Sequence, residues 1–344
     1  MDKTQPAEKN RSLFSLLLRH DADADKSRIS ARSFGILAAL TSAFFLGMTP
    51  IFGRQAILLG APPLAVVAIR TLLATGLLLG VMILFYRPYL YIYPVGLLGC
   101  LLAGWINGIG SLFYYRSLAS INAGVGQLLY SLYPFFLVMW LLILDRQIPS
   151  RLTIIRVGIA ICAVYLLTQA GFQQMNPIGV GLMLVASALY ALHIPINQRV
   201  LYDMPSPTVT VYTLLAMSSI VVPTYLFSRS PAVPSEWYVW LPVLGLTLVT
   251  FFSRLTLFFG VKHLGGMQTV LLGLSEILVT LFFAHTWLHE EFSHRQWLGV
   301  LLLIFSLMLV VFDKQPVKKQ SQGGLLGWLQ PPTTPTDIPW QLHE

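Results

Sequence analysis

The chain reads Ser-Ala-Phe-Phe-Leu-Gly-Met-Thr-Pro-Ile-Phe-Gly-Arg at 42–54, and 145 residues later Ser-Ala-Leu-Tyr-Ala-Leu-His-Ile-Pro-Ile-Asn-Gln-Arg at 187–199. Serine, alanine, proline, isoleucine and arginine recur at the same spacing inside otherwise apolar sequence. On the C-terminal side, Pro62 recurs as Pro207 at the same offset, and 118–134 aligns with 261–277 after a loss of two residues. This repeated pattern predicts that the chain contains two copies of one helical bundle.

The composition predicts that the bundle lies in a membrane. Hydrophobic residues fill 56% of the 344 positions and charged residues 10%, and the mean hydropathy is +0.70, which exceeds what a soluble core requires. Apolar runs of roughly 17 to 25 residues span a bilayer as helices, so we expect an all-α membrane protein with ten transmembrane helices. The runs lie near 34–53, 62–86, 94–115, 121–144, 152–170, 177–197, 207–227, 238–259, 267–288 and 296–312.

The repeated sequence pattern divides these ten spans into two five-helix repeats. Because five is odd, the second repeat enters the membrane from the opposite side, which makes the repeats inverted. The expected parts are an N-terminal tail, a first repeat, a second repeat and a flexible C-terminal tail, at 1–32, 33–170, 177–312 and 313–344.

Basic residues indicate orientation and not nucleic-acid binding. The formal net charge is +8, but seven of the 22 Lys and Arg precede Ser33 and three follow Phe312. With a cytoplasmic N-terminus, fifteen basic residues fall on the inner side and four on the outer side, as the positive-inside rule requires. We therefore expect a multi-pass protein of the cell (inner or plasma) membrane with both termini in the cytoplasm and no nucleic-acid partner.

The two cysteines and the first residues carry little chemistry. Cys100 and Cys162 fall inside predicted spans without a metal-ligand spacing, so we expect neither a disulfide framework nor a metal or cofactor. The composition of 1–32 predicts disorder or a short helix on the membrane surface.

Glu276 is the one acidic residue deep inside a predicted span. It lies about nine residues into its helix, roughly 14 Å from the end, where a bare carboxylate costs a few kcal/mol or more unless it is protonated, paired or facing water. Arg70 and Arg254 reach similar depths. Two hypotheses remain: Glu276 couples protons or binds a substrate ammonium while an arginine receives a substrate carboxylate, or Glu276 and an arginine form a permanent structural ion pair.

Polar residues at helical spacing predict the walls of a central cavity around these charges. The candidates are Asn107 with Ser111 and Tyr115 on the same face, Tyr130, Tyr133, Tyr190 and His193. A tyrosine here can instead bond two helices together, and His193 can serve as packing or as a proton relay.

Three prolines are expected to kink their spans: Pro50, Pro134 and Pro195.

The enzyme motifs in the sequence are incomplete. His289 and His294 are five residues apart, whereas two zinc ligands on one helix face are four apart, and no dinucleotide loop, phosphate loop or nucleophile elbow occurs.

These residues resemble the drug/metabolite transporter superfamily, specifically its EamA-type permeases. Similar to that family are 43–50 in the first span, 62–70 opening the second, 117–134 in the fourth, and Leu274-Ser275-Glu276 with Glu290 in the ninth. The resemblance covers about 33–312 and places Arg70 and Glu276 at family positions. The sequence departs from the family pattern at two places. Ile277 stands where the family often has a proline after the glutamate, and the fourth span ends in Asp145-Arg146-Gln147 where the family usually has a glutamate.

The resemblance implies a ten-helix carrier that moves small organic metabolites by alternating access. We expect a secondary transporter of amino acids or related compounds, by export or exchange, with protons as the candidate coupling ion. An organic-phosphate or nucleotide-sugar exchanger of the same superfamily is one alternative, and an intramembrane enzyme or scaffold subunit is another. Substrate, direction and oligomeric state stay open.

Overall fold

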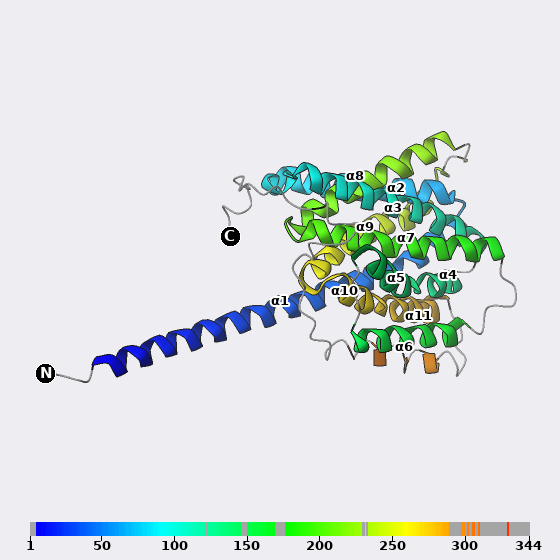
Figure 1. Ribbon diagram of the computed structural model, residues 1–344. Coiled ribbons are helices and arrows are strands. Elements are labelled where there is room, and N and C mark those ends of the chain that lie inside the picture. The colour runs from blue at the N-terminus through cyan, green and yellow to red at the C-terminus, as the bar shows by residue number, and fades with distance from the viewer. Residues whose placement is uncertain are drawn as a thin grey trace.

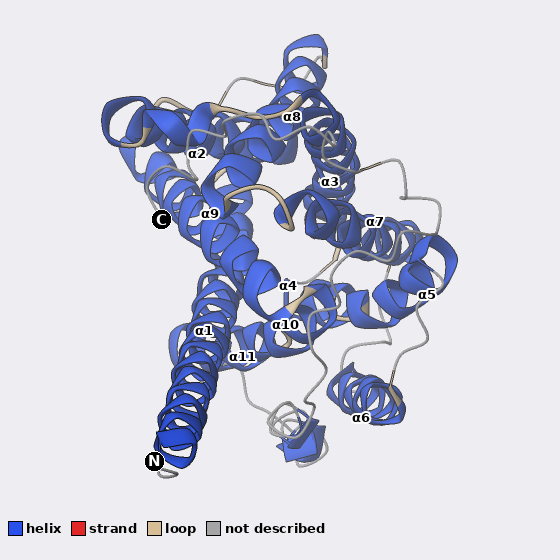
Figure 2. Cartoon of the chain, turned by 60° about the vertical axis from the view of Figure 1, so that its left-hand side comes forward, coloured by secondary structure: helices blue, strands red, loops and turns tan. Residues whose placement is uncertain are grey.

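A computed structural model describes residues 5–121, 123–145, 150–168, 176–228, 231, 233–288, 297–299, 301–302, 305–306, 309 and 329. The described residues form helices and no strands (Figures 1 and 2). The helices are α1 (Gln5–Leu58), α2 (Pro63–Phe85), the short 3-10 helix η1 (Arg87–Leu90), α3 (Pro94–Ser120), α4 (Ala123–Tyr130), α5 (Tyr133–Asp145), α6 (Arg151–Thr168), α7 (Pro177–Leu201), α8 (Ser206–Phe227), α9 (Trp237–Leu264), α10 (Gly266–Gly273) and α11 (Ser275–Leu288).

Membrane-length helices dominate this set. Seven are long and apolar enough to cross a bilayer by length and composition: Arg32–Leu58, Pro63–Phe85, Pro94–Ser120, Pro177–Leu201, Ser206–Phe227, Trp237–Leu264 and Gly266–Phe283. Tyr133–Leu144 and Ile154–Ala163 are shorter apolar helices. Large apolar side chains such as Phe85 and Phe227 are exposed at 73% and 89%, which suits a surface that faces lipid. The prediction of an all-α membrane protein is confirmed.

The first helix is longer than the sequence predicts. Residues 5–31, which we expected as a disordered tail or a short surface helix, continue α1 as one helix that projects from the bundle (Figure 1). No glycine or proline falls between Ala7 and Phe34, so this stretch lacks the residues that most strongly end a helix. The tenth span (296–312) lies largely outside the described residues, as do His289, His294 and nearly all of the C-terminal tail.

Two predicted spans are broken in the middle. The 121–144 span divides into α4 and α5 at Ser131 and Leu132, and the 267–288 span divides into α10 and α11 at Leu274. The bounds of α4, moved by 143 residues, are those of α10. The second break forms although Ile277 stands where the family that the sequence resembles often has a proline, a departure that had put a kink in this span in doubt.

The three predicted kink prolines have different settings. Pro50 and Pro195 lie inside the continuous helices α1 and α7, where each removes a backbone hydrogen bond. Pro134 lies in the first turn of α5, where its missing N–H costs no helix bond. It therefore follows a helix break and does not bend a continuous helix.

The helices pack in a crossed pattern around the middle of the bundle. α1 packs along α9, α3 packs along α7, and α2 lies against α8, as Figure 2 shows. The first helix of each sequence repeat thus lies against the third helix of the other repeat. α6 lies at the periphery beside α4 and α5.

Glycine allows the closest of these approaches. A Cβ on Gly104 of α3 would lie 2.5 Å from the Thr213 carbonyl oxygen of α8, and a Cβ on Gly47 of α1 would lie 2.6 Å from the Glu276 carbonyl oxygen of α11. By contrast, a Cβ on Gly76 or Gly80 of α2 would meet nothing within 4 Å in the described part of the chain. Glycine at the first two positions therefore sets helix spacing.

Candidate functional site

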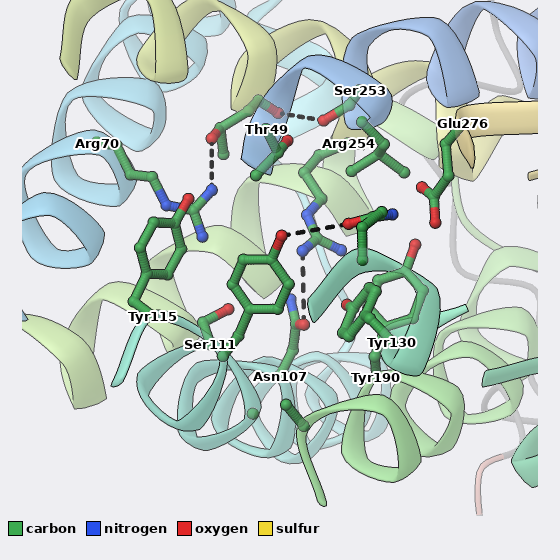
Figure 3. A pocket seen from close by; sticks show the side chains of 16 residues that line it. Thr49, Arg70, Asn107, Ser111, Tyr115, Tyr130, Tyr190, Ser253, Arg254 and Glu276 are labelled. Atoms are coloured by element: carbon green, nitrogen blue, oxygen red, sulfur yellow. Dashed lines mark hydrogen bonds between the residues drawn. The ribbon is translucent and has the colours of Figure 1, made fainter. Parts of the chain in front are cut away.

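A polar cavity lies where α1, α2, α3, α4, α7, α9 and α11 meet (Figure 3). Its empty volume, open ends included, is about 520 Å³. Residues of both sequence repeats form its walls. The polar lining residues are Thr49, Arg70, Asn107, Ser111, Tyr114, Tyr115, Gln127, Tyr130, Tyr190, Thr250, Ser253, Arg254 and Glu276.

Arg70 reaches the cavity from α2. Its side chain is buried, and its Nη1 donates to the Thr250 hydroxyl at 2.9 Å. The guanidinium carbon lies 4.8 Å from the centre of the Tyr115 ring, a cation–π distance. Within the described residues, Arg70 Nε and the Tyr115 hydroxyl have no hydrogen-bond partner. The charge of Arg70 is thus held by neutral groups and keeps donor capacity.

Arg254 reaches the same cavity from α9. Its Nη2 donates to the Asn107 side-chain oxygen at 3.5 Å, its Nη1 lies 3.5 Å from His193 Nε2, and its guanidinium carbon is 5.5 Å from the centre of the Tyr190 ring. These three partners are uncharged or able to be uncharged. Figure 3 shows the guanidinium of Arg254 between Arg70 and Glu276.

Glu276 lines the cavity from α11. It is the second residue of α11, in the first turn after the break, where the helix dipole favours negative charge. The side chain is 2% exposed, Gln127 lies beside it, and Oε1 has no hydrogen-bond partner in the described part of the chain. No ion pair joins Glu276 to either arginine among these described residues, so the permanent bridge considered above is not formed in this conformation.

The predicted site residues divide into lining and supporting groups. Glu276, Arg70, Arg254, Asn107, Tyr130 and Tyr190 line the cavity.

Tyr133 and His193 are not lining residues, although both are buried. The Tyr133 hydroxyl donates to the Val270 carbonyl at 3.3 Å, and its ring packs 5.2 Å from that of Tyr190. His193 contacts Arg254 from outside the cavity. Both residues therefore contact lining residues or their helices without lining the cavity themselves.

Sequence reasoning missed five polar lining residues. They are Thr49, Tyr114, Gln127, Thr250 and Ser253. Hydroxyl and amide residues are common in these spans, and only the rotation of each helix decides which of them point inward. A usable signal existed for Thr250, which lies one helical turn before Arg254 and so shares its face.

Metal-site chemistry finds no support in the described part of the chain. Among those residues no group of three or more His, Cys, Asp or Glu could hold a metal ion. Cys100 is buried and Cys162 is exposed, and both are free.

A bundle of membrane-length helices around a polar cavity indicates a multi-pass membrane protein of the transporter class. The chain belongs to the EamA-like transporter family, which matches residues 33–169 and again 177–312. Membership of this family points to a membrane transporter and away from an enzyme.

Two further comparisons agree. The chain is 24% identical over 230 residues to the uncharacterized transporter sll1319 of Synechocystis sp., an alignment that spans 63% of this chain and 66%, just under two thirds, of that protein. A solved crystal structure shares the fold, with a TM-score of 0.67 and 15% identity, over 81% of this chain and 97% of the other.

Proposed function

We propose that this chain is a secondary active transporter of small organic metabolites, specifically amino acids or related compounds, by export or exchange. The central cavity is the solute site in this proposal, and access to it alternates between the two sides of the membrane. The observation that carries the proposal is a buried cavity, walled by both sequence repeats, that holds unpaired cationic and anionic side chains.

Unpartnered polar atoms support a solute with two kinds of polar group. Four lining residues have a buried polar atom without a partner in the described part of the chain: Arg70 Nε, the Tyr115 hydroxyl, the Thr49 hydroxyl and Glu276 Oε1. Buried polar atoms are nearly always satisfied. A zwitterion satisfies both sets, because its carboxylate accepts from a guanidinium and its ammonium donates to a carboxylate.

The proposed architecture is ten helices in two inverted five-helix repeats, 33–170 and 177–312. Three observations support it: the breaks at matching positions of the two repeats, the crossed packing of α1 on α9 and of α3 on α7, and the two separate family matches. In such carriers, rocking of one bundle against the other moves access from side to side.

Glu276 is the proposed coupling group, with protons as the coupling ion. A carboxyl group that alternates between a proton and a substrate ammonium links the movement of the two. We further propose the cell (inner or plasma) membrane with both termini cytoplasmic, on the basic residues near the ends of the chain.

A reconstituted transport screen tests the proposal. Purified protein in proteoliposomes would be loaded with a mixture of the twenty amino acids, and efflux and uptake of each would be measured by mass spectrometry at two pH gradients. We expect movement of a subset of amino acids by the wild type, and its loss in Arg70→Ala and Glu276→Gln. Identical profiles for all three proteins would overturn the site, and a wild type that moves nothing would overturn the function.

A further inference from the structure

His193 and Arg254 belong to one chain of hydrogen bonds behind the cavity. These bonds link α3, α7, α8 and α9: Met217 Sδ of α8 accepts from Asn107 Nδ2 at 3.5 Å, Asn107 Oδ1 accepts from Arg254 Nη2 at 3.5 Å, and Arg254 Nη1 faces His193 Nε2 at 3.5 Å. The other imidazole nitrogen, His193 Nδ1, contacts the Tyr190 carbonyl oxygen. His193, Asn107 and Arg254 are 0%, 3% and 7% exposed.

Chemistry permits one placement of protons along this chain. A carbonyl oxygen only accepts, so His193 Nδ1 carries the hydrogen that it donates to Tyr190. A guanidinium only donates, so His193 Nε2 accepts from Arg254 and carries no hydrogen. The same rule orients Asn107, whose oxygen must face Arg254.

We infer that His193 is a neutral Nδ1–H imidazole that positions the Arg254 guanidinium in the cavity and does not carry protons. A second proton on His193 would have to sit on Nε2, facing a guanidinium 3.5 Å away. Two like charges at that distance in a buried site repel strongly. The histidine therefore serves Arg254 as a hydrogen-bond acceptor.

With this assignment the partners of Arg254, like those of Arg70, are uncharged groups. Arg254 is held by His193, by Asn107 and by the face of Tyr190, all neutral in this arrangement. Its charge is fixed in place while no carboxylate among the described residues neutralises it. The inference rests on the proposed function in one respect: the fixed charge attracts the anionic end of the transported solute.

One residue faces each ring nitrogen of His193. Arg254 of α9 lies on its Nε2 side, and Tyr190 of its own helix lies on its Nδ1 side with ring centroids 4.9 Å apart. These two sides of the imidazole are therefore occupied by a guanidinium and by a backbone carbonyl with its tyrosine ring.

Magnetic resonance tests the protonation state without reference to any solute. The chain has seven histidines, and comparison of ¹⁵N-histidine spectra of the wild type and His193→Gln in lipid identifies the His193 signals. We expect one protonated and one unprotonated ring nitrogen, with the hydrogen on Nδ1 and no change from pH 5 to 8. An imidazolium within that range, or a hydrogen on Nε2, would overturn the inference. His263→Gln, at the far end of α9, is the matched assignment control.

Transport tests the positioning role with a matched pair of amides. His193→Gln can place an acceptor near Arg254, whereas His193→Asn is one methylene shorter and cannot. For the amino acid that the wild type moves fastest, we expect His193→Asn to raise KM about tenfold and His193→Gln to stay within about threefold, with the pH profile unchanged in both. A shifted or lost pH profile in both variants would overturn the inference and favour a relay. A wild type that moves no amino acid would contradict the proposed function, while the spectra would still decide the state of His193.

Discussion

Gly47 of α1 is in backbone contact with Glu276 of α11: a Cβ on Gly47 would lie 2.6 Å from the Glu276 carbonyl oxygen. The Thr280 hydroxyl, one turn further along α11, donates to the Gly47 carbonyl at 2.8 Å. The helix that carries the proposed coupling carboxyl is therefore seated directly on α1.

A methyl group at position 47 should push α11 away. We expect Gly47→Ala to lose about 1–3 kcal/mol of stability, as overpacking does, and to impair transport because Glu276 moves with its helix. Thermal unfolding in detergent measures the stability. Gly76→Ala is the control: a Cβ there meets nothing within 4 Å in the described residues, so its unfolding temperature should not fall. Equal effects of the two substitutions would contradict the close contact.

Glu276→Gln should uncouple transport from the proton gradient. The amide has nearly the same shape but cannot take up and release a proton at physiological pH, so accumulation driven by a pH gradient should be lost. Exchange of labelled for unlabelled amino acid under equal pH measures the uncoupled reaction, which we expect to weaken less. If the variant still accumulates amino acid along a pH gradient, Glu276 is not the coupling group.

Arg70→Lys should weaken solute binding although it keeps the charge. Lysine lacks the planar fork that grips a carboxylate with two donors and that stacks on an aromatic ring, as Arg70 does on Tyr115 at 4.8 Å. We expect KM to rise about tenfold, the size of one charge-assisted hydrogen bond, with kcat changed much less. Arg87→Lys serves as control, because Arg87 is exposed and its Nε donates to the Ile83 carbonyl near the end of α2, away from the cavity. An unchanged KM in Arg70→Lys would remove Arg70 from the solute site.

Arg54→Leu should loosen the end of α3. The Arg54 Nη1 donates to the Leu118 carbonyl at 2.8 Å, one of the last carbonyls of that helix, which lack intrahelical partners. Loss of this bond should cost about 1 kcal/mol in a half-buried setting. Thermal unfolding would be compared with that of Arg87→Leu, which should be nearly silent. A stable Arg54→Leu protein would show that the bond is dispensable.

The sequence predicted the class of fold, and one physical property of lipid also selected the charged candidates. Charges are costly in lipid, so elimination left Glu276, Arg70 and Arg254, and the structure places all three around one cavity. Whether they serve transport is still a prediction.

The helix breaks were missed because hydropathy records apolar character and not backbone hydrogen bonding. Leu274 is itself strongly apolar, yet α10 ends before it and α11 begins after it. Likewise Gly76 and Gly104 are each followed by a second glycine four residues later, but of the two a Cβ only on Gly104 would meet another helix in the described part of the chain. Rotation of each helix about its axis decides such differences, as it decided that Thr49 and Gln127 line the cavity.

The most direct measurement is the accessibility of the cavity from each side of the membrane. Ser111 of α3 lines the cavity and is 8% exposed, so Ser111→Cys would be introduced with Cys100→Ala and Cys162→Ser and exposed to a membrane-impermeant thiol reagent from either side. Alternating access predicts labelling from each side under opposite gradients, and protection by a transported amino acid. Thr286→Cys, on an exposed face of α11, would report any change of labelling unrelated to the cavity. If Ser111→Cys is unreactive from both sides, or if solute gives no protection, the cavity is not the transport site.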